Sequence, residues 1–140
     1  MVETEGTGSG TTGTEGSRKQ AIAGLEQLLV ALDDLAAQLV FARGQYDTAR
    51  RSLEEGDPVA TVLAKARAAE TRETIMVALD EFEKCRYVSR ISLIVAGLDD
   101  GMSISALGKG WGVSRQLISR YVGLIRKGEE GRQERGGRTQ

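Results

Sequence analysis

One stripe of apolar residues constrains the fold of this 140-residue chain more than any other feature of its sequence. The stripe advances by alternating steps of four and three residues, as in a coiled coil, and so returns to the same side of an α-helix every seven residues. All nine of its positions are apolar: Leu25, Leu28, Leu32, Leu35, Leu39, Ala42, Tyr46, Ala49 and Leu53. We therefore expect one long helix whose apolar side packs against other helices.

The sequence also indicates where this helix begins and ends. Ser17 and Gln20 have the spacing of a capping box, so we expect the helix to begin at Ser17. Gly56, Asp57 and Pro58 suit a helix C-terminus, a helix N-cap and the first position of a second helix. A short connection between long helices predicts an antiparallel hairpin.

The second helix of this hairpin has no clear end in the sequence. It begins near Pro58, and the pattern leaves open whether it breaks near Cys85 or continues to Gly97. The composition, with one Pro and 4% aromatic residues, favours helices throughout. We expect an all-α fold in which a long antiparallel helical hairpin is followed by a C-terminal trihelical unit.

Composition divides the chain into four parts. Residues 1–16 are rich in Gly, Thr and Glu and are expected to form a disordered tail. Residues 17–87 are expected to form the hairpin, which would serve dimerisation or partner docking. Residues 88–127 would form the C-terminal unit, and residues 128–140, rich in Gly and charge, a second disordered tail.

The net charge of −1 conceals two halves of opposite sign. Residues 1–83 carry 8 Lys and Arg against 15 Asp and Glu, a net charge of −7. Residues 84–140 carry 11 Lys and Arg against 5 Asp and Glu, a net charge of +6. This asymmetry favours a C-terminal half that faces a polyanion.

Several classes of protein are disfavoured. The chain has no His, and its single cysteine, Cys85, can neither form an intrachain disulfide nor build a zinc site. We expect no enzyme activity, no cofactor and no small-molecule site. We see no signal-peptide pattern and no apolar run long enough to span a membrane, so we expect a cytoplasmic protein that makes no membrane contact.

Residues 104–123 carry the pattern of two helices joined by a sharp turn. Gly112 tolerates the positive φ that such a turn requires. Ser103 and Ser114 are placed to cap the two helices. Apolar residues give each helix an inner face: Leu107 and Trp111 in the first, and Leu117, Ile118, Tyr121, Leu124 and Ile125 in the second, with Val113 turning inward between them. The opposite face of the second helix is polar and basic: Gln116, Ser119, Arg120, Gly123 and Lys127.

This segment resembles the helix-turn-helix superfamily, as in homeodomain-like regulators, resolvase C-terminal domains and the promoter-recognition domain of sigma factors. The resemblance covers residues 88–127 and is carried by Gly112-Val113-Ser114-Arg115 and the residues that follow. It implies that the second helix enters the DNA major groove. The chain departs from the superfamily at Gly108, where Ala is usual on the inner side of the first helix.

On this interpretation, candidate base contacts lie at the start of the second helix: Ser114, Arg115, Gln116, Ser119 and Arg120. Candidate phosphate contacts are the surrounding cations: Lys109, Arg126 and Lys127. The function we expect is sequence-specific binding of double-stranded DNA by a small bacterial or phage transcriptional regulator, associated with the nucleoid and acting as a homodimer through the Leu25–Leu53 stripe. The same stripe could instead be used fully within one chain. The alternative function is a helical protein–protein adaptor or assembly factor whose helix-turn-helix-like unit binds protein.

Overall fold

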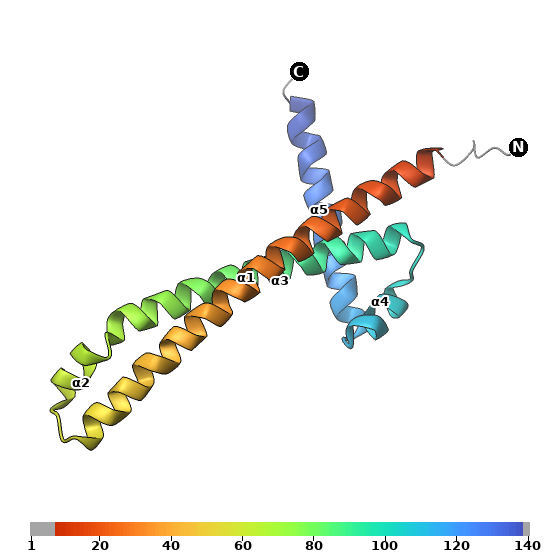
Figure 1. The fold of residues 1–140 in the computed structure, drawn as a ribbon. Helices are drawn as coiled ribbons and strands as arrows, with labels where there is room; N and C mark the ends of the chain where they lie inside the picture. The colour runs from red at the N-terminus through yellow and green to blue at the C-terminus, as the bar shows by residue number, and fades with distance from the viewer. Residues whose placement is uncertain (1–7, 139–140) are drawn as a thin grey trace, which may run out of the picture. The chain divides into compact units, whose positions relative to one another are not determined.

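The computed structural model of the chain describes the backbone of residues 8–138 and the side chains of residues 13–131. This part of the chain contains helices and no strand, which confirms the all-α prediction (Figure 1). The helices are α1 (Gly8–Glu54), α2 (Val59–Lys65), α3 (Ala68–Asp99), α4 (Ile104–Trp111) and α5 (Arg115–Arg138). Among the residues described, no helix is both long enough and apolar enough to cross a bilayer.

Contacts within the chain divide it into two compact units, and α1 and α3 each run through both. One unit, Gly24–Tyr87, is the hairpin. The other combines Met1–Ala23 with Val88–Gln140 and contains α4 and α5. The sequence analysis assigned residues 17–23 to the hairpin, whereas in the structure they belong to the unit that contains α4 and α5.

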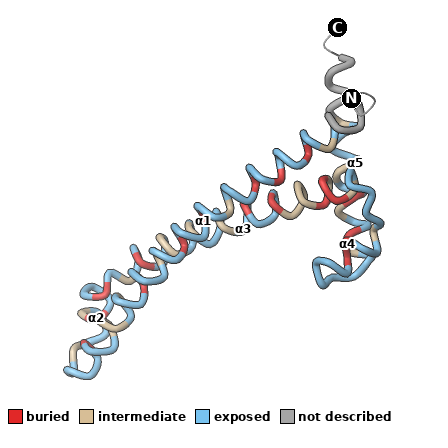
Figure 2. The backbone as a smooth tube through the Cα atoms, turned by 45° about the vertical axis from the view of Figure 1, so that its right-hand side comes forward, coloured by how far each residue is buried: buried red, intermediate tan, exposed pale blue. Residues whose placement is uncertain are grey.

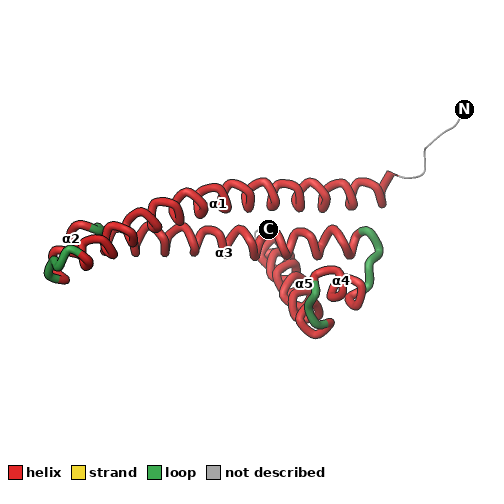
Figure 3. The backbone as a smooth tube through the Cα atoms, turned by 60° about the horizontal axis from the view of Figure 1, so that its bottom comes forward, coloured by secondary structure: helices red, strands yellow, loops and turns green. Residues whose placement is uncertain are grey.

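In the hairpin unit, α1 and α3 run antiparallel side by side, and α2 lies at the connection between them (Figures 1 and 3). Their buried residues form a seam along the pair (Figure 2). Most of these side chains are small, which lets two helix axes approach closely. The buried residues are Gly24, Ala31, Leu35, Ala42 and Ser52 on α1, and Thr71 and Cys85 on α3.

This seam uses only half of the predicted apolar stripe. Leu28, Leu35, Ala42 and Ala49 are buried or half-buried. The alternate positions are 39–62% exposed: Leu25, Leu32, Leu39, Tyr46 and Leu53. One partner helix covers a band only about two positions wide. The residue that precedes each exposed position is buried or half-buried: Gly24, Ala31, Gln38, Gln45 and Ser52.

The hairpin connection turns at Gly56 as predicted, but Asp57 and Pro58 do not have the helix positions that were predicted for them. Gly56 has a φ of 86°, and its N–H donates to the carbonyl of Leu53 at 3.0 Å, as expected for a helix C-terminus. Pro58 is the N-cap of α2 rather than its first residue. Asp57 is not a cap either, because its carboxylate accepts hydrogen bonds from Ser52 Oγ at 2.6 Å and Lys65 Nζ at 2.7 Å.

Beyond α2, the structure resolves the open question about the second helix. The expected continuous helix is interrupted after Ala66, where Arg67 adopts a φ of 50°. The guanidinium of Arg67 lies over the ring of Phe41, 6.0 Å from its centre, and forms an ion pair with Glu70. After this interruption α3 continues through Cys85 to Asp99 without a break.

Both ends of the chain differ from the predicted tails. α1 begins at Gly8, so residues 8–16 are helical, and residues 1–7 lie outside the described residues. Ser17 is buried inside α1 and donates its hydroxyl to the carbonyl of Thr14 at 3.0 Å, as a mid-helix serine does. α5 continues to Arg138, because Glu, Gln and Arg between the glycines are good helix formers. Residues 139–140 again lie outside the described part.

Candidate nucleic-acid interface

Three helices build the core of the second unit. Ile94 from α3, Leu107 from α4, and Ile118 and Val122 from α5 are buried together. Half-buried apolar residues pack around them: Leu98, Ile104, Tyr121 and Ile125. This core holds α4 and α5 against the end of α3, so the predicted trihelical unit is confirmed.

The turn between α4 and α5 has the local geometry that the sequence predicted. Gly112 has a φ of 72° and a ψ of 30°, in the left-handed region. Its N–H donates to the carbonyl of Lys109 at 3.2 Å, and the N–H of Val113 donates to the carbonyl of Gly108 at 2.9 Å. These two bonds form a Schellman motif, which ends α4 abruptly.

Serine caps start both helices of this pair. Ser103 Oγ accepts from the N–H of Ala106 at 3.0 Å, and Ser114 Oγ accepts from the N–H of Leu117 at 3.1 Å. Each cap satisfies one of the free N–H groups of a helix N-terminus and is worth about 1 kcal/mol. The direction of α5 as it leaves the turn is therefore set by Gly112 and Ser114.

Gly108 lies where α4 and the turn that follows it pack closely. Gly108 is buried, and a Cβ atom there would lie 3.0 Å from the carbonyl oxygen of Val113. Gly97 on α3 is similarly close, since its Cβ would lie 2.6 Å from Leu107 Cδ2. The turn and α4 thus approach their neighbours so closely that a methyl group at either position requires a shift.

Three residues predicted to face inward do not. Trp111 is 41% exposed, Val113 38% and Leu124 54%. α4 ends at Trp111 after eight residues, and Leu107 and Gly108 are the residues it buries. The chain then turns at Gly112, and Val113 lies outside the core.

The sequence analysis missed one polar contact of this core. Arg90 on α3 donates from Nη1 to the hydroxyl of Tyr121 on α5 at 2.6 Å, and its guanidinium lies 5.6 Å from the centre of the ring. The two residues are 31 positions apart, so no local pattern could have paired them. The contact ties the start of α5 to α3.

The outer face of α5 brings four of the five candidate base contacts together. Arg115, Gln116, Ser119 and Arg120 are all exposed and line one shallow hollow. Ser114 is exposed at the start of the helix, and its cap bond uses the hydroxyl oxygen as acceptor, which leaves the hydroxyl hydrogen to donate.

The candidate phosphate contacts precede or follow the residues of the hollow in the sequence, and all three are exposed: Lys109 on α4, and Arg126 and Lys127 on α5. Among the described side chains, no carboxylate forms an ion pair with these three residues or with Arg115 and Arg120.

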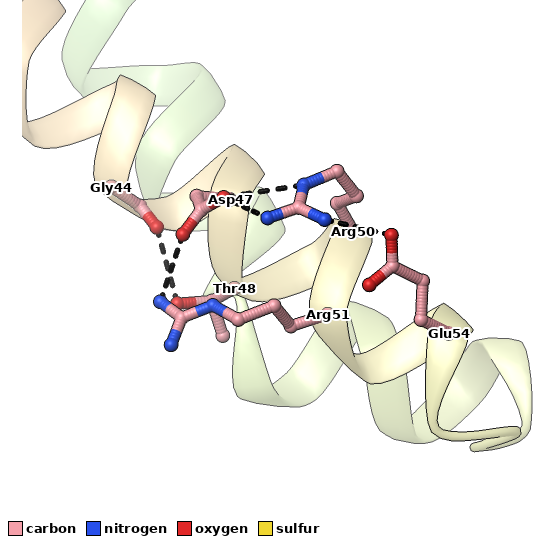
Figure 4. Close-up of polar contacts among 6 residues, drawn as sticks. All are labelled: Gly44, Asp47, Thr48, Arg50, Arg51 and Glu54. Atoms are coloured by element: carbon pink, nitrogen blue, oxygen red, sulfur yellow. Dashed lines mark hydrogen bonds and ion pairs between the residues drawn. The ribbon is translucent and has the colours of Figure 1, made fainter.

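Several cations of the hairpin, in contrast, form ion pairs with carboxylates. Arg50 pairs with Asp47 and Glu54, both at 2.7 Å, and Arg51 pairs with Asp47 at 2.9 Å (Figure 4). These bonds lower the pKa of Asp47 and raise the pKa of Arg50. Most cations of the hairpin unit are thus paired with carboxylates, Arg43 and Arg72 excepted, whereas the five cations of the candidate site have no such partner among the described side chains.

Comparison with known protein families, curated proteins and solved structures finds no match to this chain. Within the described residues, no group of His, Cys, Asp and Glu is placed to hold a metal ion. What the site can do therefore follows from its own side chains. Two guanidiniums, an amide and hydroxyls on the exposed start of a helix can form hydrogen bonds to base edges and to phosphate oxygens.

Proposed function

We propose that this chain binds double-stranded DNA sequence-specifically, with α5 in the major groove, and acts as a small dimeric transcriptional regulator. One observation carries the proposal: Arg115, Gln116, Ser119 and Arg120 share the exposed face of a helix start whose direction a glycine turn and a serine cap determine. The N-terminal residues of a recognition helix are the ones that contact bases in helix-turn-helix complexes.

Each side chain has a role that suits its chemistry. Arg115 and Arg120 would each donate two hydrogen bonds to a guanine, and Gln116 would pair with an adenine. Ser114 and Ser119 can donate to or accept from either kind of base. The surrounding cations, Lys109, Arg126 and Lys127, would bind phosphates and so fix the register of the protein on the duplex.

A second function is favoured by a different observation. Trp111 and Val113 expose apolar surface at the turn beside the hollow, and large exposed apolar side chains are typical of protein interfaces. On this alternative the unit would bind a protein, and the chain would be an adaptor or assembly factor.

DNA-binding measurements separate the two proposals. Binding-site selection from random duplexes, followed by fluorescence anisotropy of the recovered site, should show specific binding that weakens as salt rises. The variant Arg115→Ala/Arg120→Ala should lose about a hundredfold or more in affinity, because each bidentate contact to guanine is worth about 1–3 kcal/mol.

The matched control is Lys84→Ala/Arg86→Ala, which removes two exposed, ion-paired cations from α3 in the hairpin unit. It should bind the selected site about as well as the unaltered chain. The proposal fails if selection recovers no sequence and the chain shows no salt-dependent DNA affinity. Equal affinity of the Arg115→Ala/Arg120→Ala variant would also overturn it.

A further inference from the structure

Among the described residues, the hairpin leaves a row of large apolar side chains partly exposed along α1. We call Leu25, Leu32, Leu39, Tyr46 and Leu53 the outer stripe of α1. Its members are spaced every seven residues, so they lie in one line along the helix. Three further apolar residues widen it and are 45–61% exposed: Leu29 on α1, and Met76 and Leu79 on α3.

The outer stripe and the apolar residues of α3 lie on the same flank of the hairpin. Each stripe residue directly follows a seam position of α1, as Leu32 follows Ala31 and Leu53 follows Ser52. Leu79 likewise follows Ala78 on the seam of α3, and in an antiparallel helix pair these two flanks meet on one side. A groove confirms the arrangement, since Leu39 and Tyr46 of the stripe line it together with Ile75 of α3.

The opposite flank of the hairpin has the reverse character. A groove there is lined by four carboxylates, those of Asp34, Glu70, Glu73 and Glu81. Two copies of the chain would repel each other if they met through this acidic flank. The acidic groove therefore disfavours self-association through this flank relative to the apolar flank.

We propose that a second copy of this chain covers the outer stripe, so that two hairpins form a four-helix bundle. The stripe is symmetric in sequence about Leu39. A twofold axis beside Leu39 would place each Leu39 against its copy, Leu32 against Tyr46 and Leu25 against Leu53. Each of these pairs in such an isologous contact is apolar on both sides. The inference deepens the proposed function, because it supplies the dimer that reads two half-sites.

The exposed area suits a stable dimer. The eight residues of this flank are each about half exposed, so together they present the surface of about four free side chains. At roughly 150–200 Å² for each large side chain, this amounts to roughly 600–800 Å² per chain. Stable interfaces bury about 800 Å² from each partner.

Charge at the end of the stripe permits the same contact. Arg43 and Arg50 also line this groove, and the guanidinium of Arg50 is already bound to Asp47 and Glu54 on α1 (Figure 4). Asp47 also binds Arg51. In the twofold contact, this end of each stripe faces the Leu25–Leu32 end of the other copy, so the Arg50 groups of the two copies do not meet.

Sedimentation equilibrium of the full chain without DNA, between about 1 and 100 µM, tests the proposal. We expect a monomer–dimer equilibrium in which Leu32→Gln/Leu39→Gln raises the dissociation constant at least about a hundredfold, since four apolar side chains leave the interface. Glutamine preserves helix propensity, and circular dichroism verifies that the helices remain. The matched control is Val30→Gln/Val40→Gln. These two residues of α1 lie outside the stripe and are more exposed than Leu32 and Leu39, so the dimer should stay intact.

A cross-linking measurement covers the case in which the double variant unfolds. Oxidation of the Leu39→Cys variant should link two chains by a disulfide, whereas Val30→Cys should not. A chain that is monomeric at about 100 µM would overturn the proposal, as would an unchanged dimer in Leu32→Gln/Leu39→Gln or the absence of a Leu39→Cys cross-link. Because no DNA is present, a dimer that binds no DNA refutes the proposed function alone, and a monomer that binds DNA refutes only this interface.

Discussion

Gly108 and Gly110 lie two residues apart in α4 but in different surroundings. Gly108 is buried, and a Cβ there would meet the carbonyl oxygen of Val113 at 3.0 Å. Gly110 is exposed and has no atom within 4 Å of an added Cβ. The same substitution at the two positions therefore separates the helix propensity of glycine from its role in close packing.

We predict that Gly110→Ala raises the free energy of unfolding by about 0.5–1 kcal/mol, because alanine restricts the unfolded chain and favours the helix. Gly108→Ala should lack this gain, since the turn has to move to admit the methyl group, and should be about 1 kcal/mol or more less stable than Gly110→Ala. Urea unfolding followed by the fluorescence of Trp111, the single tryptophan, reports on this unit. Equal stability of the two variants would contradict the packing argument.

At the scale of whole elements, the junction of α1 and α2 depends on Asp57. Its carboxylate accepts from Lys65 Nζ and Ser52 Oγ and thereby bridges the end of α1 and the end of α2. The hydrogen bond from Lys65, and next the one from Ser52, lower the pKa of Asp57 below its usual value of 3.8. The same contact raises the pKa of Lys65.

A carboxyl group whose pKa is lower in the folded chain stabilises the fold above its unfolded pKa. That contribution disappears as the pH falls through the folded pKa, so we expect Asp57→Asn to be less stable than the unaltered chain near pH 7. The difference should shrink below about pH 4. Urea unfolding followed by circular dichroism over this pH range measures it. Asp33→Asn, which removes an exposed carboxylate without an ion pair among the described side chains, should show no such pH-dependent difference.

The elements that the sequence predicted well are those with local causes. Gly56 and Gly112 mark turns because only the residue itself has to adopt a positive φ, and Ser103 and Ser114 cap helices three residues away. No glycine or proline near Arg67 marks the helix break in the sequence. The side chain of Arg67 there contacts Phe41, 26 positions earlier in the chain, a contact that neighbouring residues do not predict.

The heptad spacing of α1 likewise predicted a helix but not the side on which it packs. Leu28 and Leu35 belong to the seam, while Leu25 and Leu32, in the same predicted stripe, are exposed. The buried and the exposed residues of the stripe share the same seven-residue spacing. Which of the two sets packs depends on the small residues that α3 presents to α1. At the candidate site, the outer face of α5 followed from helical spacing, whereas the exposure of Trp111 depends on where α4 ends.

At the scale of the whole molecule, the distribution of ion pairs sharpens the charge asymmetry of the sequence. The acidic half carries a net charge of −7 and the basic half +6. Lys84 and Arg86 have carboxylate partners on α3, whereas Lys109 and Lys127 have none among the described side chains. A cation already paired within the protein releases few counterions on binding DNA, while an unpaired one that meets a phosphate releases nearly one.

We therefore predict that Lys109→Ala/Lys127→Ala weakens binding of all DNA sequences alike. It should reduce the slope of log affinity against log salt by about 2, because each phosphate contact contributes roughly 0.9. Gln116→Ala should instead leave the slope unchanged and relax the preference at one base pair, since a contact to a base edge releases no counterion. Anisotropy titrations of the full chain across a salt series, on selected and scrambled duplexes, measure both effects. Lys84→Ala/Arg86→Ala serves as the control and should change neither. If this control pair lowers the slope as much as the Lys109→Ala/Lys127→Ala pair, DNA binds along the hairpin and not at the start of α5.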